Sequence, residues 1–543
     1  PITITSNAAS TSGHFAAPSG SLTIEGMITA PPSVTVTSRL GSVTFSGGGA
    51  GYSNLQIQGG SAFIGADNGI ATSAIVDIAS IDTATLDLNG FDQTLAGLAR
   101  TLNSTTRTAT ITNAGPVNKT LTLHVATSAA YGGTIETANT TGNALITGNL
   151  SLVKTGPGIQ SISGGGDNTY TGSTTINGGI LRLQKEAGTI AIPAGNFVAI
   201  GNGGTLQLGQ SSLIHDGITA FTIDGGTFDL ASFVEGIIPA LTITNATVSG
   251  SSAGFLLARG GFIGTGTNLI SKGISVRGFD PNSGRFAIAS GVTTVSGSIQ
   301  TDGANAAQGI IKTGEGTLIL SGANSYTGPT LLSGGTTIVS GSLAAASAVT
   351  VGNAVNPAMV AILAGSGSVG GVGIVGSGNP LTTGASLSPG NSGGVAGILS
   401  TASLSLTAGA HLDLQIGGIT AGGEAGYDQV IASGAVNLTG ADLKLTLQGT
   451  ASFHAGDLLY LIANNSASAV TGAFATVNGN PFDPSNILLE GRHFQLTYTA
   501  NFTGANSDNM ANDVALIAVP EPRAWLTMLA GLGLLIGRRR RDK

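Results

Sequence analysis

Short runs in which apolar and polar residues alternate recur along the whole chain. Examples are Val34–Val36, Leu86–Leu88, Leu121–Val125 and Leu412–Ile416. Successive side chains of a strand point to opposite faces, so each run places its apolar residues on one face. Gly-Gly, Asn-Gly and Ser-Gly pairs follow these runs and favour turns. The pattern predicts an all-β chain of short strands, because helical periodicity is absent until the last residues.

Internal repetition narrows the fold further, since alternation alone fits a sandwich, a barrel or a parallel β-helix. Lys154–Gly158 corresponds to Lys312–Gly316, and Asn168–Gly172 corresponds to Asn324–Gly328. A weaker third copy surrounds Tyr52. Repeated units that cannot bury an apolar face alone must stack on their neighbours, so the repeats predict a solenoid of roughly 20 to 25 residues per coil.

The repeated residues resemble the autotransporter-associated β-strand repeat, which begins Lys-Thr-Gly and continues through Asn-x-Tyr-Thr-Gly to Gly-Gly. The best copies are residues 152–183 and 310–343, and the second follows the pattern more closely. Leu387–Ser392 and Tyr427–Val430 are similar to the C-terminal part of such passenger regions. The resemblance implies a right-handed parallel β-helix, with repeats that assist secretion of the passenger and catalyse nothing.

The end of the chain carries a different pattern. A Pro-containing motif precedes an almost wholly apolar segment, residues 524–537, and a basic cluster follows it. A helix of this length spans about 21 Å, less than the roughly 30 Å of a hydrocarbon core. The motif residues are Val519, Pro520, Glu521 and Pro522, and the cluster residues are Arg538, Arg539, Arg540 and Arg541.

This tail resembles the PEP-CTERM sorting signal of Gram-negative bacteria that make exopolysaccharide. The resemblance implies transient insertion of residues 524–537 in the inner membrane, with the Arg cluster held on the cytoplasmic side. It also implies processing by a membrane enzyme of the exosortase type. The alternative, a small C-terminal core helix, does not account for four consecutive Arg residues.

These patterns predict three regions. Residues 1–385 form a parallel β-helix, and residues 386–518 form its continuation, a cap or a small β-sandwich. Residues 519–543 form the sorting signal with its short apolar helix. The sequence starts at Pro1 without a Met, and we expect the encoded precursor to carry a secretion signal.

Composition excludes several classes of protein. Hydrophobic residues make up 41% of the chain, which argues against disorder despite 87 Gly residues. A net charge of −7 and only 9% charged residues leave no basic surface for nucleic acid. The absence of Cys excludes disulfides, thiolate metal sites and thiol nucleophiles.

Candidate chemistry is sparse. Some parallel β-helices are polysaccharide lyases or glycoside hydrolases, whose sites gather carboxylates on one outer face. The best local candidates for such a site are His215, Asp216, Asp224 and Asp229, for which solvated outward side chains are the plainer interpretation.

Histidine and tyrosine offer little more. The six His residues lack metal-ligand spacing, and His124 and His411 fall on the polar side of their strands. Tyr170 and Tyr326 hold matching repeat positions and are predicted to be stacking or turn residues instead of a sugar platform. We therefore predict no catalytic residue, no cofactor and no metal site.

The sequence thus favours a non-enzymatic, secreted or cell-surface protein of structural or adhesin-like type. Its expected place is the outer surface or extracellular matrix of a Gram-negative bacterium, in contact with exopolysaccharide or other surface proteins. Two alternatives remain open: a β-helix polysaccharide lyase or glycoside hydrolase acting on extracellular glycan, and a passive spacer without a specific ligand.

Overall fold

The structure is a computed structural model. It describes residues 2–3, 12–16, 20–31, 35–39, 41–78, 81–99, 107–126, 143–277, 282–302, 308–353, 359–379, 384–390, 394–449, 451–504 and 507–519. Every regular element in these ranges is a β-strand, as predicted, and none of them holds a helix able to cross a membrane. The predicted C-terminal helix, with Pro520, Glu521, Pro522 and the Arg cluster, lies outside the described residues.

The chain divides into two compact units, Pro1–Ser283 and Gly284–Lys543. The N-terminal part of the first unit contains three parallel sheets. One sheet has the order β3 (Ser21–Ile24), β6 (Ser42–Phe45), β9 (Gly60–Ile64), β11 (Ala84–Asp87), β14 (Thr108–Asn113), β16 (Asn143–Gly148). The second has the order β2 (Ser12–Ala16), β5 (Thr35–Arg39), β8 (Asn54–Ile57), β10 (Ile75–Ile78), β13 (Gly97–Ala99). The third joins β1 (Ile2–Thr3), β4 (Ile28–Thr29) and β7 (Gly49–Ala50).

The rest of the first unit continues the same arrangement. One sheet runs through β12 (Gln93–Leu95), β15 (Lys119–His124), β17 (Leu150–Thr155), β19 (Thr174–Ile176), β21 (Phe197–Ile200), β23 (Ala220–Asp224), β26 (Leu241–Thr244) and β29 (Phe262–Thr265). A second runs through β18 (Ile159–Gly164), β20 (Gly179–Lys185), β22 (Gly204–Leu208), β24 (Thr227–Asp229), β27 (Thr247–Ser249) and β30 (Thr267–Ile270). A third holds β25 (Glu235–Ile237), β28 (Leu256–Ala258) and β31 (Ile274–Val276).

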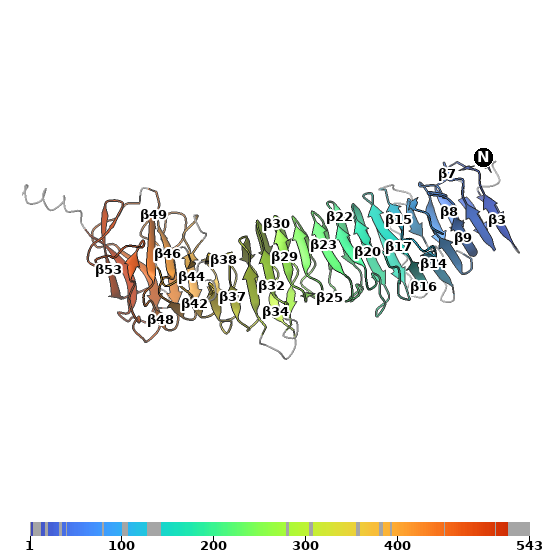
Figure 1. Cartoon of the computed structure of the whole chain (residues 1–543). Helices are drawn as coiled ribbons and strands as arrows, with labels where there is room; N and C mark the ends of the chain where they lie inside the picture. The colour runs from blue at the N-terminus through green and yellow to red at the C-terminus, as the bar shows by residue number, and fades with distance from the viewer. Residues whose placement is uncertain are drawn as a thin grey trace, which may run out of the picture. The chain divides into compact units, whose positions relative to one another are not determined.

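Through the parallel part of the chain, consecutive strands go to different sheets, so successive turns of the chain add strands to the same two long sheets. From β17 to β24 the strands alternate between two sheets, and neighbours within a sheet are parallel (Figure 1). Leu152 lies opposite Thr174 and Thr317 opposite Thr336, so a coil contains 22 residues in the first case and 19 in the second. Long parallel sheets built in this way are consistent with the predicted solenoid of the β-helix type.

The core consists of apolar side chains stacked in register from coil to coil. Leu181, Leu206, Phe228 and Val248 are successive partners and are at most 1% exposed. Burial of each such side chain contributes about 1.5–3 kcal/mol. A single coil cannot enclose these side chains, so stability depends on the coil above and the coil below.

The second unit repeats this plan. One sheet contains β32 (Arg285–Ile288), β35 (Ile310–Thr313), β37 (Thr330–Leu332), β39 (Val349–Val351), β42 (Val372–Ile374), β45 (Leu404–Leu406) and β48 (Val436–Asn437). Another contains β33 (Val292–Val295), β36 (Thr317–Leu320), β38 (Gly335–Val339), β40 (Ala361–Gly365), β43 (Ala385–Pro389), β46 (His411–Ile416), β49 (Asp442–Leu447) and β51 (Thr476–Val477). Strand β34 (Ile299–Thr301) precedes β35.

The last strands change direction. In a third sheet, β41 (Ser368–Val369), β44 (Ile398–Thr401), β47 (Gln429–Ala432) and β50 (Leu458–Asn464) are parallel. Antiparallel strands then follow in the order β54 (Asp513–Val519), β53 (Arg492–Ala500), β52 (Ile487–Leu489). The parallel stacking of this sheet therefore ends at β50. The predicted region boundaries at residues 385 and 518 stay predictions.

Candidate functional site

A lysine takes the place of an apolar residue in the interior of each repeat. Lys154 lies between Leu123 of the preceding coil and Ile176 of the following coil, and its side chain is fully buried. Lys312 lies opposite Leu332 and is also fully buried. Alternation gives the reason, because Leu150, Leu152 and Lys154 share one face of β17.

Backbone carbonyls of the adjacent turns surround each of these ammonium groups. Lys154 Nζ donates hydrogen bonds to the carbonyl oxygens of Thr155, Gly156 and Gly178 at 2.7, 2.8 and 3.0 Å. Lys312 Nζ donates to Gly314 and Gly334 at 2.7 and 2.9 Å. Burial lowers the pKa of both lysines to about 8, because desolvation disfavours the charged form. The lysine thus joins the turn of its own coil to the turn of the next.

The repeat asparagines connect coils through their side-chain amides. Asn168 Oδ1 accepts a hydrogen bond from Ile146 N at 3.0 Å, and its Nδ2 donates to Ala191 O at 2.8 Å. Asn324 Oδ1 accepts from Ile299 N at 2.9 Å, while its Nδ2 donates to Ser342 O at 3.0 Å. Each amide therefore bridges the preceding and the following coil.

The repeat tyrosines are core residues. Tyr170 and Tyr326 are 1% and 0% exposed. Their hydroxyls form hydrogen bonds with Thr174 Oγ1 at 2.7 Å and with Thr330 Oγ1 at 2.8 Å. Burial raises the pKa of Tyr326 to about 12, and burial also raises the pKa of Tyr170. This agrees with the predicted structural role and excludes a sugar-stacking platform at these two rings.

Comparison with known families identifies the same two segments. Residues 152–183 and 310–344 match the passenger-associated transport repeat. No curated protein matches the chain. The two matches support the predicted resemblance to autotransporter passengers, which are surface or secreted proteins. Lysine, asparagine and tyrosine of each passenger-associated repeat therefore hold its coil together.

Buried lysines also occur outside the matched segments. Lys185 Nζ donates to Ala144 O and Gly166 O, both at 2.7 Å, and burial lowers its pKa to about 8. Lys272 Nζ donates to three carbonyl oxygens, among them Ala253 O at 2.5 Å. The inward direction of these four lysines was not predicted, although the alternation around Lys154 indicates it.

The acids predicted as candidates for a catalytic site do not bond to one another. Asp216 Oδ2 forms an ion pair with Arg259 Nη1 at 3.0 Å. Asp229 accepts hydrogen bonds from Gln207 Nε2 and Ala231 N. His215 Nδ1 accepts one from Gly217 N at 2.8 Å, and Asp224 is exposed at the end of β23. Arg259 is a basic partner that sequence reasoning did not find.

One further carboxyl group, that of Glu235, is buried in the interior of the first unit. Glu235 is 1% exposed, and its side chain accepts hydrogen bonds from Leu213 N and Gly236 N. Burial raises the pKa of Glu235 to about 8, and the hydrogen bonds oppose this rise. In the ranges described, no three His, Asp or Glu residues gather as a metal site.

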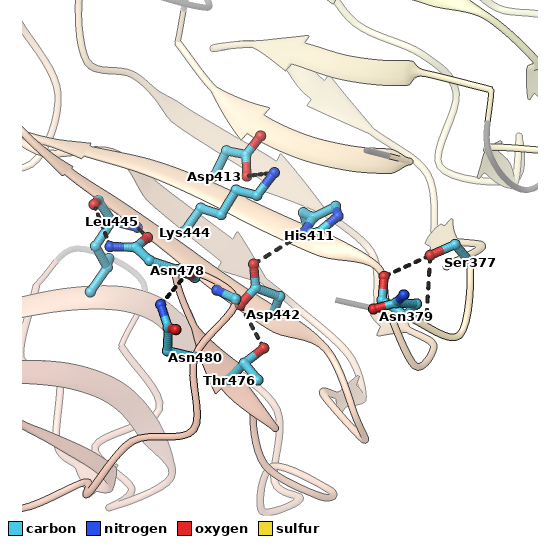
Figure 2. Close-up of polar contacts among 11 residues, drawn as sticks. Ser377, Asn379, His411, Asp413, Asp442, Lys444, Leu445, Thr476, Asn478 and Asn480 are labelled. Atoms are coloured by element: carbon cyan, nitrogen blue, oxygen red, sulfur yellow. Dashed lines mark hydrogen bonds and ion pairs between the residues drawn. The ribbon is translucent and has the colours of Figure 1, made fainter. Parts of the chain in front are cut away.

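The clearest charged group outside the repeats lies on β46, β49 and β51. His411 and Asp442 face each other in register, with Nδ1 and Oδ2 3.1 Å apart, and Thr476 Oγ1 donates to Asp442 Oδ1 at 2.6 Å. Figure 2 shows Asp442 between His411 and Thr476. Beside them, Lys444 Nζ is 4.0 Å from Asp413 Oδ1.

The burial of His411 and Asp442 limits the chemistry that this charged group can perform. His411 and Asp442 are 1% and 0% exposed, so a polymeric substrate cannot reach them. Burial raises the pKa of Asp442, but hydrogen bonds from His411 and Thr476 hold it below its usual range. Burial raises the pKa of Asp413, which Lys444 partly offsets. The arrangement connects adjacent coils electrostatically and resembles a structural ladder more than a reaction centre.

Proposed function

We propose that the chain is a non-enzymatic structural or adhesin-like protein of the passenger type, secreted or held at the cell surface. The observation that carries this proposal is the direction of the repeat residues. Lys154, Asn168 and Tyr170, like their counterparts in the second repeat, make their hydrogen bonds in the interior, within a coil or to the adjacent coil. The matched segments therefore serve to build the solenoid.

The outer face of one sheet in the first unit supports a role in shallow, repeated contacts. Side chains at successive outward positions are small and uncharged, and they lie in register. The row consists of Thr122, Val153, Thr175, Ala199, Thr222 and Thr242. We propose that such rows contact extracellular polysaccharide or a biofilm matrix, with affinity arising from repetition.

Sorting is assigned to the tail. We propose that an exosortase-type enzyme recognises Val519–Pro522 while residues 524–537 insert transiently in the inner membrane. The cluster Arg538–Arg541 would then stay cytoplasmic, because a short apolar helix followed by four Arg residues cannot pass fully through the bilayer. Processing would release the folded protein to the outer surface or the matrix.

Fractionation of the native host tests export. The wild-type protein is expected at the surface and in the medium, whereas a Pro520→Ala, Pro522→Ala double variant is expected to accumulate in the inner membrane. Pro239→Ala, in a turn before β26, is the matched control and is expected to behave like wild type. Equal distribution of all three proteins would remove the sorting role of the motif.

A polymer assay tests the non-enzymatic part of the proposal. Exopolysaccharide from the host is incubated with the purified full chain, and its length distribution is followed by size-exclusion chromatography. Retention of the polymer on the protein without shortening is expected. Progressive shortening would overturn the proposal and favour a lyase or glycoside hydrolase, and Asp216→Asn and Asp229→Asn would then locate the site.

A further inference from the structure

A pocket lies in the first unit where the connections of three successive coils meet. It measures about 310 Å³ and is lined by Asp167–Thr171, by Ile190, Pro193 and Ala194, and by His215. These residues belong to the connections from β18 to β19, from β20 to β21 and from β22 to β23. The volume is at the small end of the range for ligand sites, about 300–1,000 Å³, so it matches one small unit of a polymer.

Backbone hydrogen bonds between the coils hold the walls of this pocket. Asn168 N donates to Ile190 O at 2.9 Å, which joins the first connection to the second. His215 N donates to Ile192 O at 2.9 Å, which joins the second connection to the third. The walls are therefore in place before a ligand arrives, and binding does not have to order them.

The first connection presents alternate side chains to solvent. Asp167, Thr169 and Thr171 are exposed, whereas Asn168 and Tyr170 are buried. Side chains two residues apart share a face in an extended segment, so one carboxylate and two hydroxyl groups lie on the outer side of the chain here. The Tyr170 hydroxyl is already bonded to Thr174, so the polar groups open to a ligand are the three outer ones.

Hydrogen bonds to the backbone define what Asp167 and His215 can offer. Asp167 Oδ1 accepts a hydrogen bond from Ile190 N at 2.8 Å, and a carboxylate has acceptor positions on both oxygens. His215 Nδ1 accepts from Gly217 N at 2.8 Å, so the neutral ring carries its proton on Nε2. The pocket thus combines a charged acceptor with an imidazole donor.

The second repeat shows that the coil does not require this carboxylate. Asn324 and Tyr326 are buried and hydrogen-bonded like their counterparts in the first repeat. Ala323 occupies the position that corresponds to Asp167. The framework residues are therefore common to both repeats, while the acid is a feature of the first repeat alone.

We propose that this pocket binds one neutral pyranose residue of an extracellular polysaccharide. Ile190, Pro193 and Ala194 offer an aliphatic surface to the C–H face of the sugar ring. The Asp167 carboxylate accepts hydrogen bonds from its hydroxyl groups, and His215 Nε2 donates to a hydroxyl oxygen. The site rests on the proposed function and deepens it, because it names the sugar class and the residues that select it.

The charges around the pocket favour a neutral sugar over a uronic acid. Among the described residues that line it, none is Lys or Arg. The Lys185 ammonium group is buried and donates to two backbone carbonyls, and Arg259 is paired with Asp216. A sugar carboxylate would therefore lie near Asp167 without a cation to offset the repulsion.

Saturation-transfer NMR with simple glycosides tests the site on the full chain. The neutral probes are the methyl pyranosides of glucose, galactose and mannose, and the acidic probes are those of glucuronic and galacturonic acid. Saturable binding of at least one neutral probe is expected, with a Kd at least about fivefold lower than that of either acid. Absence of saturable binding by every neutral probe, or tighter binding of an acid, would overturn the proposal.

Two variants locate the binding. Asp167→Asn keeps the acceptor for Ile190 N but removes the charge, and it is expected to weaken binding by about tenfold, because hydrogen bonds to a charged acceptor are stronger. Ala194→Trp fills the pocket from an exposed position and is expected to abolish binding. Hydrogen exchange of the β19 and β21 amides should match wild type in both. Wild-type affinity in both variants would refute the site.

The second repeat supplies the matched controls. Glu315→Gln removes an exposed carboxylate, and Ala345→Trp places the same large ring on an exposed turn. Both are expected to bind the neutral probe with wild-type affinity, and a loss in either as large as that of its counterpart would contradict the assignment.

Retention of host exopolysaccharide separates the pocket from the proposed function. Equal retention by wild type and Ala194→Trp, with no neutral probe bound, would refute the pocket and leave the proposed function standing. Binding of a neutral probe to wild type but not to Ala194→Trp, without any retention of the polymer, would support the pocket and refute the proposed contact with the host polysaccharide.

Discussion

At the residue scale, the contacts of the two buried repeat lysines show what a lysine at this position does. A buried ammonium group requires hydrogen-bond acceptors, and the carbonyl oxygens of the adjacent turns supply them. Lys154 and Lys312 each contact carbonyls from two successive turns. The aliphatic part of the side chain packs in the core, while the ammonium group donates hydrogen bonds to the carbonyl oxygens of the turns.

Loss of this lysine is expected to destabilise the coil. Lys312→Met keeps an apolar side chain of similar length but leaves the carbonyls of Gly314 and Gly334 without the lysine donor. We expect the free energy of unfolding to fall by about 2 kcal/mol. Lys444→Met, which removes a partly exposed ion pair, is the control and should change stability by less than about 1 kcal/mol. Hydrogen exchange of the β35 and β37 amides measures the difference, and equal protection in both variants would contradict it.

The lowered lysine pKa values predict a rise of stability at alkaline pH. Lys154, Lys185 and Lys312 have folded-state pKa values of about 8, below the usual 10.5. Between these values the unfolded chain binds more protons than the folded chain, so the free energy of unfolding increases with pH. Urea unfolding from pH 8 to about 9.5, below the titration of the tyrosines, should show this increase. A Lys154→Met, Lys185→Met, Lys312→Met chain should show a smaller slope, and an unchanged slope would refute the assignment.

Glu235 predicts the opposite dependence at lower pH. Burial raises the pKa of Glu235 from 4.5 to about 8, so the folded chain keeps its proton where the unfolded chain has lost it. Its contribution to stability is present below pH 4.5 and is lost as the pH rises to about 8. Glu235→Gln cannot titrate and should reduce the fall in stability across this window. Urea unfolding at pH 5 and pH 8 measures the effect, and an equal fall in stability in the variant and the wild type would contradict the assignment.

At the scale of the element, the Gly-Gly pair of each repeat determines the backbone conformation of the turn between two strands. Gly179 has φ +60°, and a Cβ there would lie 2.3 Å from Gly158 O. Gly335 has φ +64° and would place a Cβ 2.5 Å from Gly314 O. A Cβ on the preceding residue, Gly178, would lie no closer than 3.5 Å to any neighbour, which is Gly156 O. The second glycine is therefore required by both backbone conformation and close approach of the coil below.

The two glycines provide a matched pair of variants. Gly179→Ala combines an unfavourable backbone conformation with a clash against backbone, and it should destabilise the coil by more than about 2 kcal/mol. Gly178→Ala should change stability by less than about 1 kcal/mol. Urea midpoints compare the two proteins. A Gly178→Ala loss as large as that of Gly179→Ala would contradict this account of the turn.

The sequence patterns predicted the positions of strands better than they predicted contacts between side chains. The alternation at Leu121–Val125 and Leu412–Ile416 corresponds to β15 and β46, because alternation is a local property of one strand. Burial follows it only in part, since His411 and Gln415 on the polar side of β46 are buried as well. The pairing of His411 with Asp442 joins residues 31 apart and depends on the length of the intervening coil, which includes irregular turns. Local patterns do not encode that register. For the same reason, the Asp216–Arg259 ion pair was not predicted.

At the scale of the whole molecule, each unit has parallel sheets to which every coil contributes strands, and the repeats recur in both units. The interior residues that define the repeat form their hydrogen bonds within the solenoid, which leaves outward rows for interaction with other molecules. Antiparallel strands β52–β54 lie at the C-terminal end of one sheet and cover the edge of β50. The edge of β50 is therefore not available for pairing with a strand of another molecule.

The intact mass of the protein recovered from the cell surface and the medium tests the central claim most directly. A sorted, passenger-type protein should have lost the apolar segment and the Arg cluster, with its new C-terminus between Val519 and Arg523. A mass that still includes Arg538–Lys543 would contradict the account, since the tail would then be a permanent anchor and the motif before it would have no role in processing.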